Sequence, residues 1–193
     1  MDLNGLNIGF AMCGSFCTFS RAINEISALK NTGANIIPIM SETSYNTDTR
    51  FGKASEFREK FRDITGNTVL HTVFETEPIG PKKLLDALVI LPCTGNTLAK
   101  LSHGIADTSV TLAAKAHLRN KRPIIIGVST NDGLGTAAEN IGRLLTRENI
   151  YFIPFSQDDY IHKPNSLVAD FKKLNETLKL ALDGKQLQPI LAV

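Results

Sequence analysis

The sequence predicts an α/β fold, in which a doubly wound parallel sheet forms the middle of three layers. Two observations predict it. Short apolar runs alternate with segments of helical periodicity along the whole chain, and those runs lack the in-and-out alternation of half-exposed strands. The 193 residues suit one domain, at residues 1–193, because linkers, repeats and low-complexity tracts are absent.

In the first half of the chain, apolar spacing and chain breakers define the elements. Ile23, Ile26 and Leu29 recur at helical spacing before Gly33, which predicts a helix with a glycine stop. Pro38 lies inside an apolar strand, although proline removes a donor from the ladder. In chain order we predict a strand at residues 6–13, a helix at 19–30, a strand at 35–41, an amphipathic helix at 49–64 and a short strand at 67–77.

The second half of the chain repeats this alternation. Residues 119–122 (Arg-Asn-Lys-Arg) bring cations to the end of a predicted helix, where they complement its dipole. In order we predict a strand at residues 87–91, helices at 97–103 and 108–118, a strand at 123–129, a helix at 133–146, a strand at 150–155 and a final helix at 166–182.

The charge balance excludes several classes of partner. Lys and Arg number 21 and Asp and Glu 19, so the net charge of +2 indicates neither nucleic acid nor another strong polyanion as a partner. No apolar run approaches the roughly 18 residues that span a membrane, and the first residues lack the pattern of a signal peptide. Three cysteines without a regular framework fit a reducing compartment, so we expect a cytoplasmic protein.

The polar turn at residues 92–97 (PCTGNT) is the most informative segment of the chain. It follows the apolar run at 87–91 and opens a helix, and ligands of open parallel sheets bind at such junctions. Thr94, Asn96 and Thr97 supply hydroxyl and amide groups, and Gly95 allows the backbone to approach a ligand closely. Because the turn carries no charge, it suits a neutral, planar, hydrogen-bonding group.

Comparable turns follow three other predicted strands. Gly14 and Ser15 end the first strand, where free N–H groups at a helix start favour an anion, although neither G-x-G-x-x-G nor G-x-x-x-x-G-K-[ST] is present. The other two turns are residues 41–44 (SETS) and 129–133 (STNDG). Four strand ends at one sheet edge predict a shared pocket. Simple helix caps at Ser15 or Thr18, and solvated loops, remain as alternatives.

No metal site or catalytic residue follows from the cysteines and histidines. Cys13 and Cys17 are spaced C-x₃-C without a fourth ligand, and Cys93 has no histidine partner identifiable by spacing. Asp158, Asp159, His162 and Lys163 form a polar cluster that could be imagined as a metal site, but a polar loop is the favoured interpretation. We therefore predict no metal and leave the catalytic residues unassigned.

Residues 92–97 resemble the Pro-Ala-Ser-Ala-Asn-Thr signature of the homo-oligomeric flavin-containing cysteine decarboxylase-like flavoproteins. The likeness continues through residues 98–107, where that family has a similar helix followed by an aspartate. One branch of the family is matched more closely, at residues 48–52, 77–83, 113–120, 129–132, 154–159, 163–170 and 185–189. The resemblance thus covers nearly the whole chain.

This resemblance implies a Rossmann-like (flavodoxin-like) fold and a homo-oligomer, a trimer or a multiple of it, with FMN bound near the contacts between copies. By motif matching, the expected FMN-binding residues form three groups: Gly14, Ser15, Phe16, Ser41 and Thr43 near the phosphate, Thr94, Gly95, Asn96 and Thr97 at the flavin, and Ser129 and Thr130 beside them. Asn131 is the expected substrate-binding residue, since it alone is kept from the Pro-Ala-Met-Asn motif of the decarboxylases.

Departures from the family pattern shape the functional expectation. The Met-Trp of the decarboxylases reads Leu134-Gly135 here, their C-terminal substrate flap has no match, and His71 is only the nearest candidate for their catalytic histidine. The matched branch instead implies one component of an enzyme that acts with a nicotinamide-binding partner to form a small dicarboxylate by two-electron oxidation. A non-catalytic flavin- or dicarboxylate-binding component is the alternative, and cysteine decarboxylation ranks third. Cations available for a dicarboxylate are Arg50, Lys53, Lys82, Lys83 and Arg119.

Overall fold

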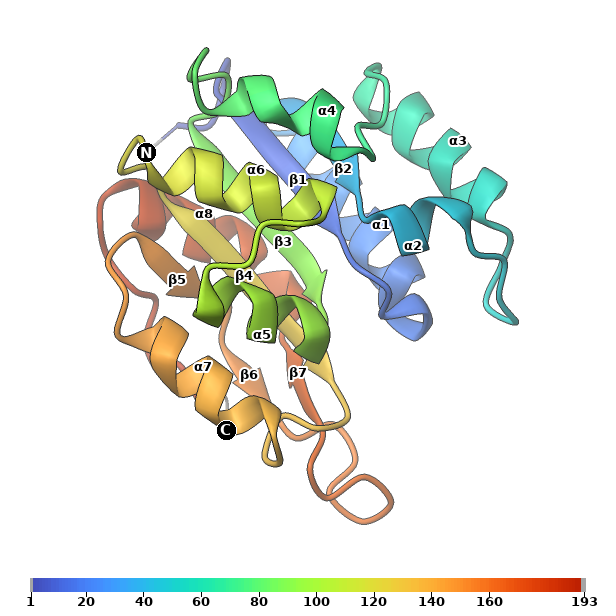
Figure 1. Ribbon diagram of the computed structural model, residues 1–193, viewed down its shortest axis with the longest axis vertical. Helices are drawn as coiled ribbons and strands as arrows, with labels where there is room; N and C mark the ends of the chain where they lie inside the picture. Colours follow the sequence, from blue (N-terminus) through green and yellow to red (C-terminus); the bar gives the residue numbers. More distant parts are fainter. Residues whose placement is uncertain (1, 192–193) are drawn as a thin grey trace.

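The computed structural model describes residues 2–191, and a twisted sheet runs through its centre (Figure 1). The hydrogen-bonded strand order in this part of the chain is β2-β1-β3-β4-β7-β6, and β5 pairs with β4. β1, β2, β3, β4 and β5 are parallel, whereas β7 is antiparallel to both β4 and β6. The strands are β1 (Asn7–Met12), β2 (Asn35–Met40), β3 (Ala87–Cys93), β4 (Ile124–Thr130), β5 (Ile150–Phe152), β6 (Phe155–Ser156) and β7 (Leu167–Ala169).

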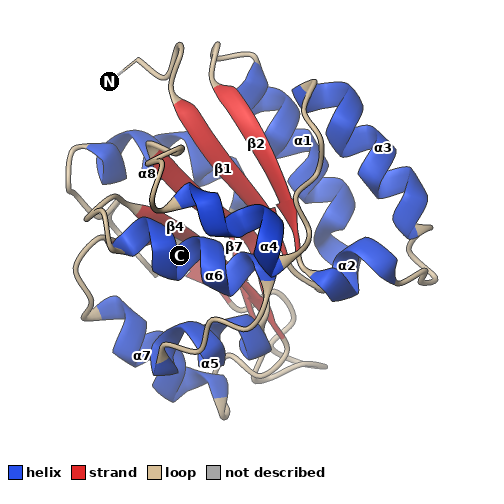
Figure 2. Cartoon of the chain, turned by 45° about the horizontal axis from the view of Figure 1, so that its top comes forward, coloured by secondary structure: helices blue, strands red, loops and turns tan. Residues whose placement is uncertain are grey.

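Helices cover both faces of the sheet, as Figure 2 shows. α1, α3 and α8 pack on one face, and α4, α5, α6 and α7 pack on the other. Their bounds are α1 (Phe19–Lys30), α2 (Glu42–Asn46), α3 (Ala54–Thr65), α4 (Val73–Thr76), α5 (Gly95–His103), α6 (Ser109–Leu118), α7 (Ala137–Leu145) and α8 (Leu174–Leu182). The predicted three-layer α/β fold is confirmed, with an antiparallel hairpin added at one end of the sheet.

The core lies along β3 and β4, whose side chains are buried from Ala87 to Cys93 and from Ile124 to Ser129. Strands covered on both faces need apolar side chains on both sides, which is why these segments read as unbroken apolar runs. The parallel order β2-β1-β3-β4-β5 reverses direction between β1 and β3, and ligands of such sheets bind outside the carboxyl ends of the strands at that reversal.

The position of β2 explains how Pro38 is tolerated. β2 pairs with β1 on one side only, and its other side meets a single bridge from Leu70. The Pro38 carbonyl accepts the Leu70 N–H at 2.9 Å, so proline's missing donor faces this sparsely paired edge. Proline is compatible with an edge strand because it removes no ladder bond there.

The predicted strand at residues 67–77 is wrong. Leu70 makes one bridge to Ile39, and the chain then turns into the short helix α4. Thr72 and Glu75 form a reciprocal capping box, the T-x-x-E pattern of a helix start, which outweighs the β-branched and aromatic residues around it. Phe74, at 87% exposure, points outward from this helix.

Three other boundaries differ from the predictions. The helix predicted from residue 49 begins at Ala54, because residues 49–52 form a tight turn and the Asp48 carboxylate accepts the Ala54 N–H. The strand predicted at 150–155 divides at Pro154 into β5 and β6. The helix predicted from residue 166 begins at Leu174, because residues 167–169 pair as β7 with β4 and β6.

Replacing Thr72 by alanine is expected to lower the free energy of unfolding by about 1 kcal/mol, because α4 loses its side-chain cap. Urea unfolding would measure the change. Thr136 provides the matched control, since it precedes α7 without making a side-chain cap bond, and its alanine variant should unfold at the wild-type urea concentration. Equal losses in both variants would contradict the capping role of Thr72.

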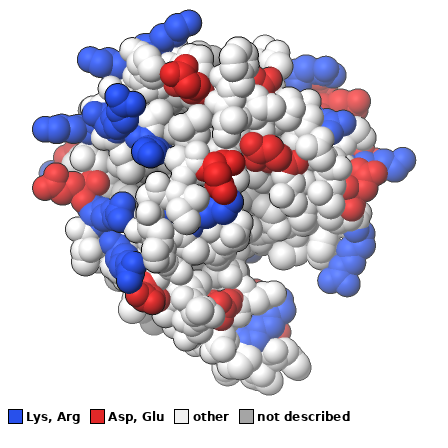
Figure 3. Space-filling model, viewed as in Figure 1, with Lys and Arg blue, Asp and Glu red and all other residues white. Residues whose placement is uncertain are grey.

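Within residues 2–191, no helix combines the length and apolar character required to traverse a bilayer. Basic and acidic side chains are interspersed over the face shown in Figure 3. The loop between β6 and β7 projects from the lower end of the molecule (Figure 1), and two of its residues, Asp158 and Lys163, line a pocket.

Candidate functional site

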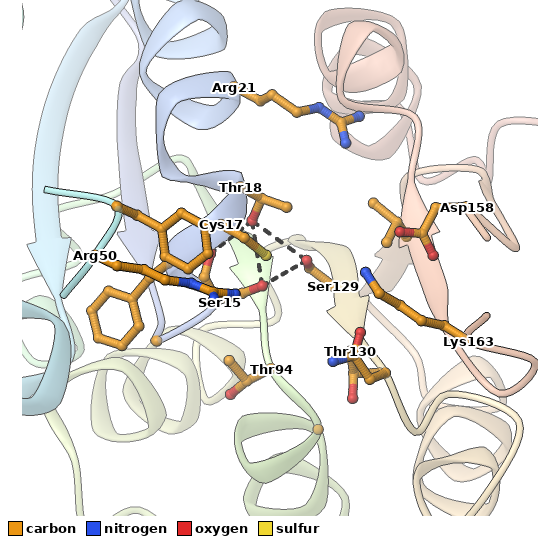
Figure 4. Close-up of a pocket in the computed structure, with 16 residues that line it drawn as sticks. Ser15, Cys17, Thr18, Arg21, Arg50, Thr94, Ser129, Thr130, Asp158 and Lys163 are labelled. Carbon is orange, nitrogen blue, oxygen red and sulfur yellow. Dashed lines mark hydrogen bonds between the residues drawn. The ribbon is translucent and has the colours of Figure 1, made fainter.

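A pocket of about 460 Å³ lies at the carboxyl ends of β1, β3 and β4 (Figure 4). This volume falls within the range of small-molecule and cofactor sites. Three of the four predicted polar turns line it, through Gly14, Ser15, Phe16, Thr94, Gly95, Ser129, Thr130 and Asn131. The parallel strand directions bring these turns together, although the first and the last of them are more than one hundred residues apart in sequence.

Three hydroxyl groups meet in the middle of the pocket. Ser15 Oγ and Ser129 Oγ are 2.8 Å apart, and Thr18 Oγ1 lies 3.4 Å from each of them (Figure 4). Thr18 Oγ1 also donates to the Ser15 carbonyl at 2.9 Å. Since a hydroxyl both donates and accepts, the protons of Ser15 and Ser129 can turn toward the oxygen atoms of a ligand.

The turn after β1 suits an anion. Residues Phe16–Thr18 form a 3₁₀ turn that leads directly into α1, and the first N–H groups of such a segment have no partner within it. Those N–H groups lie beside Ser15 and favour negative charge. A Cβ on Gly14 would lie 3.5 Å from the Phe16 ring and 4.0 Å from the Thr43 methyl group, so this turn lies near the start of α2.

The turn after β3 presents only part of its predicted set to the pocket. Thr94 caps α5 by accepting the Thr97 N–H at 3.3 Å, and its hydroxyl lies 3.1 Å from Thr97 Oγ1. A Cβ on Gly95 would lie 3.0 Å from Thr130 Oγ1, so glycine permits the close approach of this turn to β4. Thr97 is buried and Asn96 is exposed, and neither lines the pocket.

The turn after β2 borders the pocket without lining it. Ser41 caps α2 by accepting the Ser44 N–H at 3.2 Å, and its hydroxyl bonds to that of Ser44. Thr43 reaches the site only through its methyl group beside Gly14. The roles of Ser41, Thr43, Asn96 and Thr97 in cofactor binding therefore stay predictions.

Charged side chains surround the hydroxyl cluster. Arg50 and Lys163 enter the pocket from opposite sides with Ser15 and Ser129 between them, and Arg21 approaches from α1 (Figure 4). The Arg21 guanidinium lies 4.5 Å from the centre of the Phe171 ring. Asp158 supplies the one carboxylate among the described lining residues, so the pocket carries an excess of positive charge.

Sequence reasoning found only some of these charged residues. Arg50 was among the cations predicted for a dicarboxylate, whereas Lys53, Lys82, Lys83 and Arg119 do not line the pocket. Arg21 was not assigned to the site from the sequence. Arg21 follows Thr18 by three residues on a helical segment, so the two side chains lie on the same side of that helix, and this spacing was the available signal. No local signal could have assigned Lys163 to the pocket, because the β6–β7 hairpin brings it there.

Comparison with known proteins decides the family. The model of the family described as Flavoprotein matches residues 1–159 of this chain. This chain belongs to the flavoprotein family. Family membership supports a flavin cofactor for this flavoprotein, and the hydroxyl groups, free N–H groups and cations of its pocket suit a cofactor that carries a phosphate.

The flavoprotein is a homologue of the B subunit of dipicolinate synthase. The Bacillus subtilis (strain 168) protein of that name is 45% identical over 190 residues, which cover 98% of this chain and 95% of the relative. The crystal structure of the corresponding dipicolinate synthase protein from Bacillus halodurans has a TM-score of 0.92 at 43% identity and covers 100% of this chain and 99% of its own.

A more distant neighbour is the FMN-dependent cysteine decarboxylase SpaF. Its crystal structure has a TM-score of 0.71 at 22% identity and covers 94% of this flavoprotein and 97% of its own chain. At this level of identity the likeness shows the fold alone.

The buried thiols of the flavoprotein are poor nucleophiles. Burial raises the pKa of Cys13 to about 11 and that of Cys93 well above its ordinary value. Both are therefore protonated at neutral pH, and the thiolate is the reactive form of cysteine. Within residues 2–191, no group of three or more His, Cys, Asp and Glu side chains is placed to hold a metal.

The histidines occupy other places in the fold. His71 stacks on Tyr45, with ring centres 3.6 Å apart, and lies 3.2 Å from Glu75. His103 contacts Arg143, His162 contacts Asp159, and His117 is a buried residue of α6. None of the described side chains that line the pocket is a histidine, so the structure brings no imidazole to the predicted flavin site.

Proposed function

We propose that this flavoprotein is the FMN-binding component of a dipicolinate synthase, equivalent to the B subunit of the Bacillus subtilis enzyme. It acts with the nicotinamide-binding A subunit to form dipicolinic acid from the dihydrodipicolinate-pathway intermediate, in the cytoplasm of the mother cell during sporulation. The observation that carries the proposal is the 45% identity to the Bacillus subtilis protein over 98% of the chain. The pocket adds independent support, because it combines a phosphate-type turn with excess positive charge for a small dicarboxylate.

The residues of the pocket divide between the two ends of an FMN molecule. Ser15, Thr18 and Ser129, with the N–H groups of Phe16 and Cys17, would hold the phosphate. Thr94 and Gly95, which are uncharged and belong to the turn after β3, would lie against the flavin ring. When bound, FMN would accept two electrons. A dihydropyridine dicarboxylate loses two electrons when it is oxidised to its aromatic product.

The chain itself contributes binding and orientation. Hydroxyl groups fixed by their mutual hydrogen bonds present oxygen and hydrogen at set positions, and the flanking cations attract the carboxylates of a substrate. Asp158 is the carboxylate that lines the described pocket and the group available there to accept a proton. We assign it no further role.

Two measurements test the proposal. The purified chain should bind FMN, seen as a flavin absorption band, and the chain mixed with its nicotinamide-binding partner should form dipicolinate faster than that partner does by itself. Equal rates with and without the chain, under conditions where the partner limits, would contradict the catalytic role. Release of carbon dioxide from a peptide with a C-terminal cysteine would support a decarboxylase instead.

A non-catalytic binding protein is the second candidate, and one observation favours it. The pocket brings together hydroxyl groups and cations for binding, but none of its described lining residues is a histidine. Such a protein would bind FMN or the dicarboxylate and support its nicotinamide-binding partner through contact. It would bind FMN without the flavin being reduced or oxidised during dipicolinate formation, which stopped-flow absorbance would show.

Replacing Asn96 by alanine is expected to weaken FMN binding about tenfold or to lower turnover, with the fold unchanged. Its side chain is exposed at the start of α5, where a trimer contact would place it against a flavin shared between copies of the chain. Quenching of FMN fluorescence measures the affinity. The Asn24→Ala variant, at another exposed helical position, is the control. If Asn96→Ala has wild-type FMN affinity and turnover, residues 92–97 serve only to begin a helix, and their role in FMN binding is contradicted.

A further inference from the structure

The loop between β6 and β7, residues 157–166, has a defined shape. The Asp159 carbonyl accepts the Lys163 N–H at 2.8 Å, and the Lys163 carbonyl accepts the Ser166 N–H at 2.9 Å. Gln157 Nε2 donates to the Pro164 carbonyl at 2.7 Å, which closes the base of the loop. These bonds hold the backbone of Lys163 in one position.

The same loop is attached to the end of β4. The Leu134 N–H donates to the Asn165 carbonyl at 2.9 Å, and a Cβ on Gly133 would lie 2.6 Å from Leu167 Cβ. Glycine is thus required at residue 133 for the hairpin to approach so closely. Because the turn after β4 also carries Asn131, the position of Lys163 is set relative to the predicted substrate-binding residue.

Lys163 is directed into the pocket and is free to bind an anion. Figure 4 shows its side chain directed toward Ser129, opposite Arg50. Among residues 2–191, no carboxylate lies within 4.0 Å of its ammonium group. Asp158, on the same loop, accepts a hydrogen bond from Ser166 instead. An unpaired cation in a partly enclosed pocket attracts an anion more strongly than one in open solvent.

Cations stand on both sides of the hydroxyl cluster. Arg50 lies beside Ser15 at the turn after β1, whereas Lys163 extends from the β6–β7 hairpin on the far side of Ser129. We propose that Lys163 binds a carboxylate of the substrate, and that the β6–β7 loop thereby selects a dicarboxylate over a monocarboxylate. This inference rests on the proposed function, since it assumes that FMN and a dicarboxylate share the pocket.

The test compares two ligands on the FMN-loaded chain by isothermal titration calorimetry. Dipicolinate and picolinate share the pyridine ring and differ by one carboxylate. Wild type should bind dipicolinate about fivefold more tightly than picolinate, and Lys163→Met should bind both with similar affinity. Lys163→Arg should restore most of the difference. Lys185→Met, which removes an exposed lysine that does not line the pocket, should behave as wild type.

Parallel titrations with FMN and riboflavin distinguish the phosphate from the substrate as the anion. A weaker affinity of Lys163→Met for FMN, with riboflavin unaffected, would assign Lys163 to the phosphate and overturn the inference. An unchanged preference for dipicolinate in Lys163→Met, or no preference in wild type, would also overturn it. The flavin band and product formation with the nicotinamide-binding partner are separate readouts, so failure of the proposed function would be seen independently.

Discussion

Ser129→Val is expected to weaken FMN binding about 100-fold. Ser129 is buried at the end of β4, and its hydroxyl links those of Ser15 and Thr18. Valine suits the strand backbone but places two methyl groups where the phosphate oxygens would bind, and it removes the 2.8 Å partner of the Ser15 hydroxyl. Overpacking and an unsatisfied buried polar group each cost about 1–3 kcal/mol, which together account for a change of this size.

The alanine variant at the same position separates the two causes. Ser129→Ala removes the hydroxyl and leaves space, so FMN affinity should fall only about tenfold. Fluorescence titration measures both affinities, and circular dichroism with thermal unfolding shows whether the sheet is intact. If folded Ser129→Val binds FMN as wild type does, the hydroxyl cluster is not the phosphate site and the assignment of the pocket fails.

His117 is expected to make the protein less stable as the pH falls from 7 to 5. Burial lowers the pKa of His117 to about 4, despite its hydrogen bond to the Pro123 carbonyl at 3.1 Å. Its Nδ1 is buried without a partner, so a proton there would find no acceptor. In the unfolded chain the imidazole titrates near its ordinary pKa of 6.5. As the pH falls, the unfolded state therefore takes up the proton first. This difference lowers the free energy of unfolding by about 2 kcal/mol between pH 7 and pH 5.

Urea unfolding at pH 7 and pH 5 measures this loss. His117→Gln keeps a donor for Pro123 but does not titrate, so its unfolding free energy should fall about 2 kcal/mol less than that of wild type over this range. His162→Gln is the comparison variant, because it makes the same substitution at a side chain that is 80% exposed. An equal pH dependence in wild type and His117→Gln would contradict the buried neutral imidazole.

Local patterns predicted most of the fold. Residues 19–30 form α1 with the predicted bounds, because apolar spacing and a glycine stop act within one segment. The failures lie where local preference competes with a distant partner or a cap. Residues 167–169 become β7 only because β4 and β6 pair with them, and residues 73–76 become helical because Thr72 and Glu75 cap each other.

The candidate site likewise has residues that the sequence could place and residues that it could not. Turns with small polar residues could be placed in a pocket from sequence, because parallel strands end at the same edge of a sheet. Ser15, Thr94 and Ser129 do line one pocket. The charged residues could not be placed so easily, since Arg21 is distinguished only by helical spacing and Lys163 reaches the site across an antiparallel hairpin.

By itself, the sequence determined the alternation of strands and helices and the polar turns after them, because these depend on side chains within a few residues of each other. Only the tertiary structure decided which turns meet and which charges surround them. It brought Ser129 within 2.8 Å of Ser15 and left Asn96 exposed. The physical reason is that strand pairing and the docking of the β6–β7 hairpin are contacts between distant segments, whose outcome no single segment encodes.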